Sequence, residues 1–591
     1  FDIILDADLS KITSLNFNSS DSNLRKIFLI NLIELFRNLP NLEFIELSNN
    51  ADINKDTSNI IFPKNINTFL VPDSNIEGNI DTWLNIDNLE NININLNPLY
   101  GRISTLINSN IKVLKARFRI NTLTPVDLSG VILPNTIEEL ELGSLINSNL
   151  NTYFISDISN WNFNNSNLKI LKLINFDNIQ GDMNNINIPN SIEEIEIYRI
   201  GKCDLIYNIS SLNINSKSNL KTLNLDFLSG DISNIILPTN LEFLKLDFSE
   251  ISGSFETVTI PNKLNYLSLN DIDNINFSFD LTGYDSKNLV SIYANDSNLT
   301  GDPQNILSNS NLNDIFLNYN NLTGVIDYSL NQNNIELSNN NLTFDFNNMS
   351  TNNNNSLRLN NNNSIGLFQN CSFIGVKILN LSNMGISGNF VFSNFSDLIQ
   401  LSINNNNISG DLTNITSSNI FSSNLKNLDL SNNNFTGDIT NWNISNFRWV
   451  IIGENNFIGD VSNWVLNSEW EIINFNNLSN ITGLNNLIFH LFDNRTIYTN
   501  FFRRTFNFTN IDEISNNPTQ WVIEQGDFGT YTGNLNQISE SEINNLKDGN
   551  DFDNTGTNTP WTPGHCIWWI KNAKKQTDIN TNRFFELITI Y

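Results

Sequence analysis

Residues 42–50 of the chain read LEFIELSNN, in which Leu42, Ile45, Leu47 and Asn50 follow the spacing LxxLxLxxN. The same spacing appears in LKNLDLSNN at residues 425–433, and weaker copies fill the chain between these two. Copies recur on average about every 24 residues, which is the period of a solenoid built from stacked coils. The copies start at Ile12, Leu42, Ile66, Leu89, Ile111, Ile137, Leu168, Ile192, Leu220, Leu241, Leu264, Leu289, Leu312, Gln332, Asn354, Val376, Leu398, Leu425, Phe447 and Trp470.

The alternation inside each copy predicts a short β-strand. Because successive side chains of a strand point to opposite faces, Leu428 and Leu430 point into the coil, whereas Asn427 and Asp429 point outward. Stacked coils then form a parallel sheet with one buried face. The asparagine that ends each copy is expected to bond the backbone of the turn and to satisfy groups that would otherwise be buried unpaired. These asparagines are Asn50, Asn97, Asn320, Asn340, Asn362, Asn406, Asn433 and Asn455.

The returning half of each coil has a second pattern, for example NNISGDL at 406–412 and NNFTGDI at 433–439, where Gly437 would permit a tight turn. From about residue 12 to about residue 480, the chain resembles the plant-type extracellular leucine-rich repeat family, whose consensus continues LxGxIP. The resemblance implies an α/β repeat solenoid, a horseshoe or curved rod. It places a parallel β-sheet on the concave side and irregular or short helical structure on the convex side.

The chain departs from the family pattern in two ways. The proline of the consensus is missing from these copies. Between Ile111 and Ile272, the asparagine position is also occupied by other residues, and the first half is therefore expected to turn its coils by apolar packing. These residues are Arg119, Leu145, Phe176, Ile200, Leu228, Ser249 and Ile272.

Three regions are expected. Residues 1–40 form an N-terminal cap that contains a strand and a helix within 19–36, residues 41–484 form the solenoid, and residues 485–591 form a capping or assembly module. This last region has no LxxLxL copy and is rich in aromatic residues, among them Trp561, Trp568 and Trp569.

Composition limits the function. The chain has 591 residues, with 61 acidic against 32 basic residues and a net charge of −29. This charge opposes binding to nucleic acid or to an anionic membrane surface. Asparagine makes up roughly a fifth of the chain, far above ordinary usage. No run of apolar residues is long enough to span a membrane.

Enzyme and cofactor signatures are absent. His490 and His565 are single histidines in aromatic surroundings, and the three cysteines have no zinc-binding spacing. Asp551, Asp553 and Thr555 imitate the first half of a calcium loop, but Thr562 stands where such a loop needs a bidentate glutamate. This segment is either a structural turn or a weak calcium site. We therefore predict a protein that is not an enzyme and has no cofactor.

The outward strand positions carry charges of both signs, followed by aromatic residues, which suits a protein partner. The candidate binding residues are Glu139, Glu141, Lys172, Glu194, Glu196, Lys245, Tyr266, Tyr293 and Phe316. The leading hypothesis is a non-enzymatic extracellular surface or filament protein for adhesion or assembly, which self-associates through its aromatic C-terminal region. The alternative is a recognition module, a receptor ectodomain or protein inhibitor, that binds a protein or glycan on the concave face.

An extracellular or cell-surface location is favoured because the chain begins at Phe1 rather than at methionine and contains many N-x-S/T sequons. The high asparagine content alone would generate many of these sequons. The candidate sites for N-linked glycans are Asn18, Asn208, Asn298, Asn321, Asn341, Asn380, Asn407, Asn434, Asn443 and Asn480.

Overall fold

A computed structural model gives the fold of two compact units, which we call the N-terminal unit (Phe1–Thr300) and the C-terminal unit (Gly301–Tyr591). The structure describes residues 11–16, 32–48, 56–119, 126–144, 154–155, 158–161, 163, 166–175, 180–182, 184, 187–198, 204–206, 208–209, 212–233, 235–272, 274–286, 288–352, 354–391, 395, 397–413, 424–464, 472–475, 478, 480–482, 489–490, 505–507, 520–525, 529–534 and 583–586.

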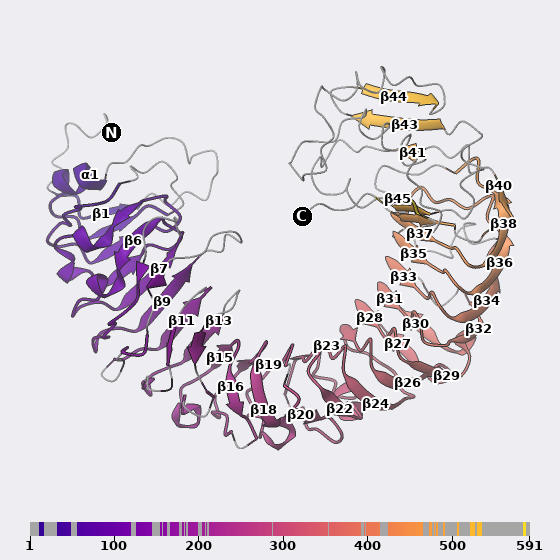
Figure 1. Ribbon diagram of the computed structural model, residues 1–591, viewed down its shortest axis with the longest axis horizontal. Coiled ribbons are helices and arrows are strands. Elements are labelled where there is room, and N and C mark those ends of the chain that lie inside the picture. Colours follow the sequence, from indigo (N-terminus) through magenta and orange to yellow (C-terminus); the bar gives the residue numbers. More distant parts are fainter. Residues whose placement is uncertain are drawn as a thin grey trace. The chain divides into compact units, whose positions relative to one another are not determined.

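Each predicted copy is followed, two residues after its start, by a strand of a main parallel sheet (Figure 1). In the N-terminal unit, these strands are β1 (Ser14–Asn16), β2 (Phe44–Glu46), β3 (Thr68–Leu70), β5 (Asn91–Asn93), β7 (Val113–Phe118), β9 (Glu139–Ser144), β11 (Ile170–Ile174), β13 (Glu194–Tyr198), β15 (Thr222–Leu225), β17 (Phe243–Lys245), β19 (Tyr266–Ser268) and β21 (Ser291–Tyr293). Neighbouring strands pair parallel and in register, as in Leu244 opposite Leu267. The predicted period and strand positions are confirmed.

The C-terminal unit continues the same pattern. Its main strands are β23 (Asp314–Phe316), β25 (Asn334–Glu336), β28 (Ser356–Arg358), β31 (Ile378–Asn380), β33 (Gln400–Ser402), β35 (Asn427–Asp429), β37 (Trp449–Ile451), β39 (Ile472–Asn474) and β42 (Thr505–Asn507). The last pairing, β39 with β42, is also parallel. It therefore carries the sheet past residue 484, where the repeats were expected to stop.

Other strands beyond residue 484 follow a different pattern. Strand β45 (Arg583–Glu586) pairs antiparallel with β42. Strands β43 (Gln520–Gln525) and β44 (Gly529–Asn534) form an antiparallel hairpin, and β41 (Phe489–His490) pairs parallel with β43. Trp561, Trp568 and Trp569 lie outside the described residues.

The returning halves of the coils contain further short parallel strands, where irregular or short helical structure was expected. In the N-terminal unit, these are β4 (Gly78–Asn79), β6 (Leu99–Arg102), β8 (Val126–Asp127), β10 (Phe154–Ile155), β12 (Gln180–Asp182), β14 (Asp204–Ile206), β16 (Ser229–Asp231), β18 (Glu250–Ser254), β20 (Phe277–Asp280) and β22 (Leu299–Gly301). In the C-terminal unit, they are β24 (Asn321–Ile326), β26 (Asn341–Asp345), β27 (Ser350–Asn352), β29 (Asn363–Ile365), β30 (Ser372–Ile374), β32 (Ser387–Asn389), β34 (Asn407–Asp411), β36 (Asn434–Asp438), β38 (Asn456–Asp460) and β40 (Ile481–Thr482). The physical reason is the repeated apolar–x–Gly pattern, which puts one buried side chain into the coil and leaves the neighbouring backbone extended.

Helices are short. In the described part of the chain, the α-helices are α1 (Leu32–Asn38) and α2 (Gln304–Leu307), and the 3₁₀ turns include η2 (Ile80–Thr82), η3 (Ile86–Asn88), η4 (Ile103–Leu106), η6 (Ile214–Ser216), η7 (Phe255–Thr257) and η8 (Phe368–Asn370). Helix α1 buries Leu32, Leu35 and Phe36, which belong to the apolar face expected for a helix within residues 19–36. Within the described part of the chain, no helix is both long and apolar enough to span a bilayer.

The core follows the predicted alternation. Leu428 and Leu430 are buried, whereas Asn427 and Asp429 on the same strand are only half-buried. The terminal asparagine also acts as expected. Asn433 Nδ2 donates to the carbonyl oxygens of Leu430 at 3.1 Å and of Ile403, in the preceding coil, at 2.9 Å. Its Oδ1 accepts from the Ile408 amide at 3.0 Å, so that one side chain joins two coils.

Described coils that lack this asparagine differ in what replaces it. Arg119 is exposed, and its Nη2 lies 2.5 Å from Asp73 Oδ1, so the prediction of apolar packing is wrong for this coil. Leu228 and Ile272 are fully buried at the position, which confirms apolar packing for these two coils. Ser249 uses its hydroxyl, which accepts from the Leu228 amide at 3.2 Å. Asn50, Leu145, Phe176 and Ile200 fall outside the part of the chain that the structure describes.

Candidate functional site

The outward side chains of the main sheet in the N-terminal unit form a surface that we call the strand face. Its first part is ionic and spans β7, β9, β11 and β13. The parallel register places Lys172 of β11 directly between Glu141 of β9 and Glu196 of β13. Lys172 Nζ lies 2.7 Å from a Glu194 carboxylate oxygen and 3.3 Å from one of Glu196. The predicted residues of these strands therefore meet in one cluster.

Two cations of β7 extend this cluster. Lys115 Nζ lies 2.7 Å from Glu139 Oε1. Arg117 Nε lies 2.6 Å from Glu141 Oε1 but its N–H is not directed at the carboxylate, and this contact is therefore ionic rather than a hydrogen bond. Glu141 also accepts a hydrogen bond from Asn95 Nδ2 at 3.1 Å. The charges are thus held in place by partners on neighbouring strands.

The pKa values within the cluster respond to this packing. Partial burial raises the pKa of the Glu196 carboxyl, and the adjacent Glu194 raises it further. Burial lowers the pKa of the Lys172 ammonium, but the hydrogen bond to Glu194 and the two carboxylate charges outweigh burial and hold this pKa above its usual value. Lys172 therefore remains charged at neutral pH.

The second part of the strand face is aromatic and spans β17, β19 and β21. Tyr266 stacks on Phe243 with ring centroids 4.2 Å apart and contacts Tyr293 at 5.2 Å. All three rings are half-buried, so each keeps an accessible side. Beside them, Lys245 Nζ lies 3.3 Å from Asp226 and 3.6 Å from Asp247. Rigid aromatic rings flanked by fixed charges are characteristic of protein-binding surfaces.

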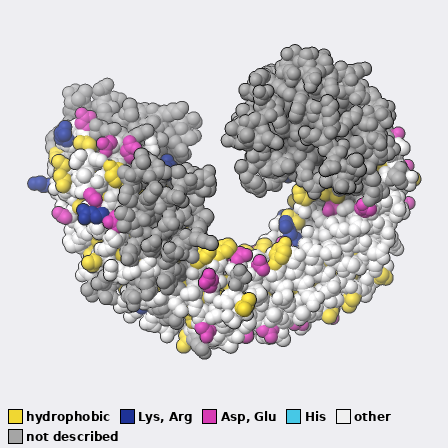
Figure 2. Space-filling model, in the orientation of Figure 1, with side chains coloured by type: hydrophobic (Ala, Val, Ile, Leu, Met, Phe, Trp, Pro, Cys, Tyr) yellow, Lys and Arg dark blue, Asp and Glu magenta, His cyan; other side chains and the backbone are white. Residues whose placement is uncertain are grey.

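The remaining predicted residue, Phe316 of β23, belongs to the C-terminal unit, where it lies opposite Glu336 of β25. The structure therefore places it in a different unit from the other eight residues. In the view of Figure 2, most of the described surface of the C-terminal unit is white, meaning neutral polar side chains and backbone. The outward positions of its later strands are only partly Asn and Ser, since β28 presents Ser356 and Arg358, β31 presents Ile378 and Asn380, and β33 presents Gln400.

Sequence reasoning missed four charged residues. Lys115 and Arg117 occupy outward positions of the copy that starts at Ile111, and extending the alternation one copy earlier would have found them. Asp226 and Asp247 follow their strands and are nearly buried. They occupy the third outward position of the alternation, the position of Ser431 in residues 425–433, and including that position in each copy would have found them.

The other candidate sites have mixed outcomes. The weak calcium candidate, Asp551, Asp553 and Thr555, lies outside the described residues, and among the described ones no group of three His, Cys, Asp or Glu side chains could hold a metal ion. Asn18 is also outside. The sequon asparagines at 298, 321, 341, 407, 434, 443 and 480 are exposed, while Asn208 and Asn380 are half-buried.

Comparisons with known proteins gave matches only among solved structures. No family model matches the chain, and no curated protein matches it. A plant peptide hormone receptor, RGFR1 in complex with RGF2, is 15% identical with a TM-score of 0.36 and covers 87% of this chain and 95% of that one. PEPR1 with AtPEP1 is 15% identical with a TM-score of 0.42, covering 84% and 76% of the two chains.

A third structure is the Arabidopsis receptor kinase HAESA with the peptide hormone IDA and the co-receptor SERK1. It is 18% identical with a TM-score of 0.44, and the match covers 82% of this chain and 78% of that one. The assignment of the coils does not depend on these matches, because it follows from the period, the parallel register and the asparagine bonds described above.

Proposed function

We propose that this leucine-rich-repeat solenoid is a recognition module that binds a protein or peptide partner on the strand face of its N-terminal unit. The observation that carries the proposal is the stack of Phe243, Tyr266 and Tyr293, which directly adjoins the Lys245 ion pairs. Aromatic residues with accessible faces supply most of the affinity at protein interfaces, and fixed charges around them select the partner.

The ionic cluster adds specificity rather than net attraction. Three cations, Lys115, Arg117 and Lys172, face four carboxylates, and the cluster is therefore close to neutral. Because the side chains are already held by one another, a partner would not have to immobilise them on binding, which lowers the entropic cost of association. A partner with an alternating charge pattern would match this surface.

Adhesion and filament assembly rank below recognition. That hypothesis depended on the aromatic residues near Trp561 meeting the N-terminal coils of another copy, and these residues lie beyond the part of the chain that the structure describes. Eight of the nine residues predicted to bind a partner lie on the strand face, in its ionic and aromatic parts. We further propose that the strand face is the concave side of a curved solenoid, that the protein acts outside the cell, and that exposed sequons carry glycans.

Selection of ligands from a displayed peptide library, with the whole chain as the immobilised target, tests the proposal. We expect enriched peptides whose affinity falls roughly tenfold or more for Tyr266→Ser or Tyr293→Ser. Tyr319→Asn is the matched control, because it removes an exposed tyrosine at a turn rather than on a strand. Equal loss in all three variants, or none in the strand-face variants, would reject the strand face as the binding surface.

A further inference from the structure

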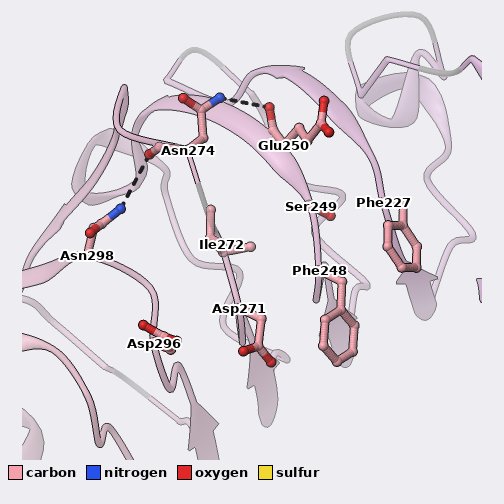
Figure 3. A pocket seen from close by; sticks show the side chains of 9 residues that line it. All are labelled: Phe227, Phe248, Ser249, Glu250, Asp271, Ile272, Asn274, Asp296 and Asn298. Atoms are coloured by element: carbon pink, nitrogen blue, oxygen red, sulfur yellow. Dashed lines mark hydrogen bonds between the residues drawn. The ribbon is translucent and has the colours of Figure 1, made fainter. Parts of the chain in front are cut away.

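A cavity of about 720 Å³ lies in the N-terminal unit, where the coils of β15, β17, β19 and β21 turn into their returning halves. Figure 3 shows Phe227, Phe248, Asp271 and Asp296 in a row along one side of it, with Glu250, Asn274 and Asn298 on the other side. We call it the edge pocket. Its volume lies within the range of about 300–1,000 Å³ that is typical of small-ligand sites.

The backbone fixes the row on the first side. Each of its four residues occupies the same position in successive coils, with φ between 50° and 59°. The amide of Phe227 donates to the carbonyl of Asp247, that of Phe248 to Asn270, and that of Asp271 to Asn295. These bonds stack the four residues one coil apart and hold their side chains in a column. The opposite side is braced in a similar way, since Asn274 Nδ2 donates to the Glu250 carbonyl oxygen and Asn298 Nδ2 donates to that of Asn274 (Figure 3).

The two phenylalanines of this column are not residues that the backbone favours, whereas its two aspartates tolerate this conformation. Left-handed φ values suit asparagine and are costly for large side chains. In the C-terminal unit, Tyr319 and Glu454 occupy the equivalent position in two coils. Five others have asparagine there, namely Asn339, Asn361, Asn383, Asn405 and Asn432. In the edge pocket, two phenylalanines take this position instead, and Phe248 leaves 46% of its surface exposed. Their ring centroids lie 5.9 Å apart with planes inclined by 22°, and both residues line the cavity.

The electrostatics of the cavity select for positive charge. Three carboxylates, those of Glu250, Asp271 and Asp296, line it, and no cationic side chain is among its lining residues. Burial raises the pKa of Asp271, and the neighbouring carboxylates of Asp296 and Asp247 raise it further, so the group lacks compensating positive charge. The carboxylates are not arranged to hold a metal ion, since no such group of three occurs in the described part of the chain. An organic cation whose charge is spread over a larger, planar group fits this cavity better than a metal ion does.

We propose that the edge pocket binds the guanidinium side chain of an arginine in a peptide or protein ligand. The planar guanidinium would stack on the Phe227 and Phe248 faces and direct its N–H groups to the Asp271 and Asp296 carboxylates, which accept charge-assisted hydrogen bonds. A lysine ammonium has no flat face to stack and is more strongly hydrated, so arginine is preferred. The strand face does not enter this argument, and the two proposals stand or fall separately.

Saturation-transfer NMR on the whole chain tests the edge pocket with two probes, acetyl-Gly-Arg-Gly-amide and the same peptide with citrulline in place of arginine. Citrulline keeps the shape but loses the charge. We expect saturable transfer to the arginine side chain and roughly tenfold weaker binding of the citrulline peptide. Equal binding of the two probes, or no binding of either, would overturn the proposal.

Variants locate the binding. The double variant D271N/D296N and the single variant F248N each introduce the residue that other coils already have at this position, so the backbone is preserved. Both variants are expected to bind the arginine peptide with roughly tenfold lower affinity. Asp87→Asn, which neutralises an exposed carboxylate elsewhere in the unit, should leave binding unchanged. Undiminished binding by D271N/D296N, with its fold verified by circular dichroism, would contradict the assignment.

Discussion

Replacing the asparagines that join the coils tests the fold most sharply, because the structure predicts a ranking among them. In Asn433→Leu, three backbone carbonyl oxygens lose the hydrogen bond that the Asn433 side chain donates, but each still accepts a hydrogen bond from another donor. Ile403 O still bonds Asn406 Nδ2, Leu430 O bonds Asn455 Nδ2, and Ser431 O bonds the Asn405 amide. The group that loses its partner is the Ile408 N–H, which donates to Asn433 Oδ1. One buried unpaired amide costs about 1–3 kcal/mol.

Asn406→Leu should cost about twice as much, because Asn406 Oδ1 accepts from two amides, those of Met384 at 3.1 Å and Ile386 at 3.0 Å. Chemical denaturation followed by circular dichroism gives the unfolding free energies of both variants. The exposed neighbour Asn407→Leu is the control and should change stability little. If Asn433→Leu and Asn406→Leu were equally destabilising, or neither differed from the control, the bonding role of these side chains would be wrong.

Three further predictions concern the C-terminal unit and the surface. Burial raises the pKa of the half-buried Asp429, although bonds from Ser431 offset part of the increase. The protonated form is therefore favoured in the fold, and the associated stability is present at low pH and lost as pH rises through the folded-state pKa. Asp429→Asn should consequently raise the denaturation midpoint at pH 7 and not at pH values below roughly 4. If the denaturation midpoint of Asp429→Asn rose by the same amount at every pH, the raised pKa of Asp429 would be excluded as the cause. Gly437→Ala should destabilise more than Gly410→Ala, because the added Cβ would lie 2.7 Å from the Thr413 nitrogen at Gly437 but 3.5 Å from its nearest neighbour at Gly410. Matching denaturation midpoints would refute this. After secretion from a eukaryotic host, peptide mapping should find glycans on exposed Asn321 and Asn434 before half-buried Asn380, and an unmodified protein would argue against the proposed location.

The sequence predicts the main sheet well because one physical rule, burial of alternate side chains, repeats in every coil. Even the copies that start with Gln332 and Asn354 form their strands. The amides of these residues replace leucine by donating to the carbonyl oxygens of Leu307 at 2.7 Å and of Gln332 at 2.5 Å. The returning strands were missed because their glycines and asparagines favour turns when considered locally. Pairing between neighbouring coils, as between β36 and β38, holds this backbone in an extended conformation.

The candidate surface was predicted only in part for a related reason. Alternation identifies outward residues such as Tyr266, but it does not identify residues at the turns, where no strand period applies. Phe227 and Phe248 are examples, since their position depends on a left-handed backbone that is evident only once the coils are stacked. Comparing the residue before each terminal asparagine position across all copies would have revealed them, together with Phe118 and Tyr319, as aromatic exceptions in a column that is mostly Asn and Asp.

Site-specific photo-crosslinking tests the recognition function most directly. A benzophenone amino acid replaces Tyr293 on the strand face in one variant and Tyr319 at the turn in another, and each is irradiated with a peptide selected on the whole chain. The account predicts a covalent adduct from the Tyr293 variant at a peptide concentration near the dissociation constant, and little from the Tyr319 variant. Adducts from the Tyr319 variant alone, or equal yields from both, would contradict binding on the strand face.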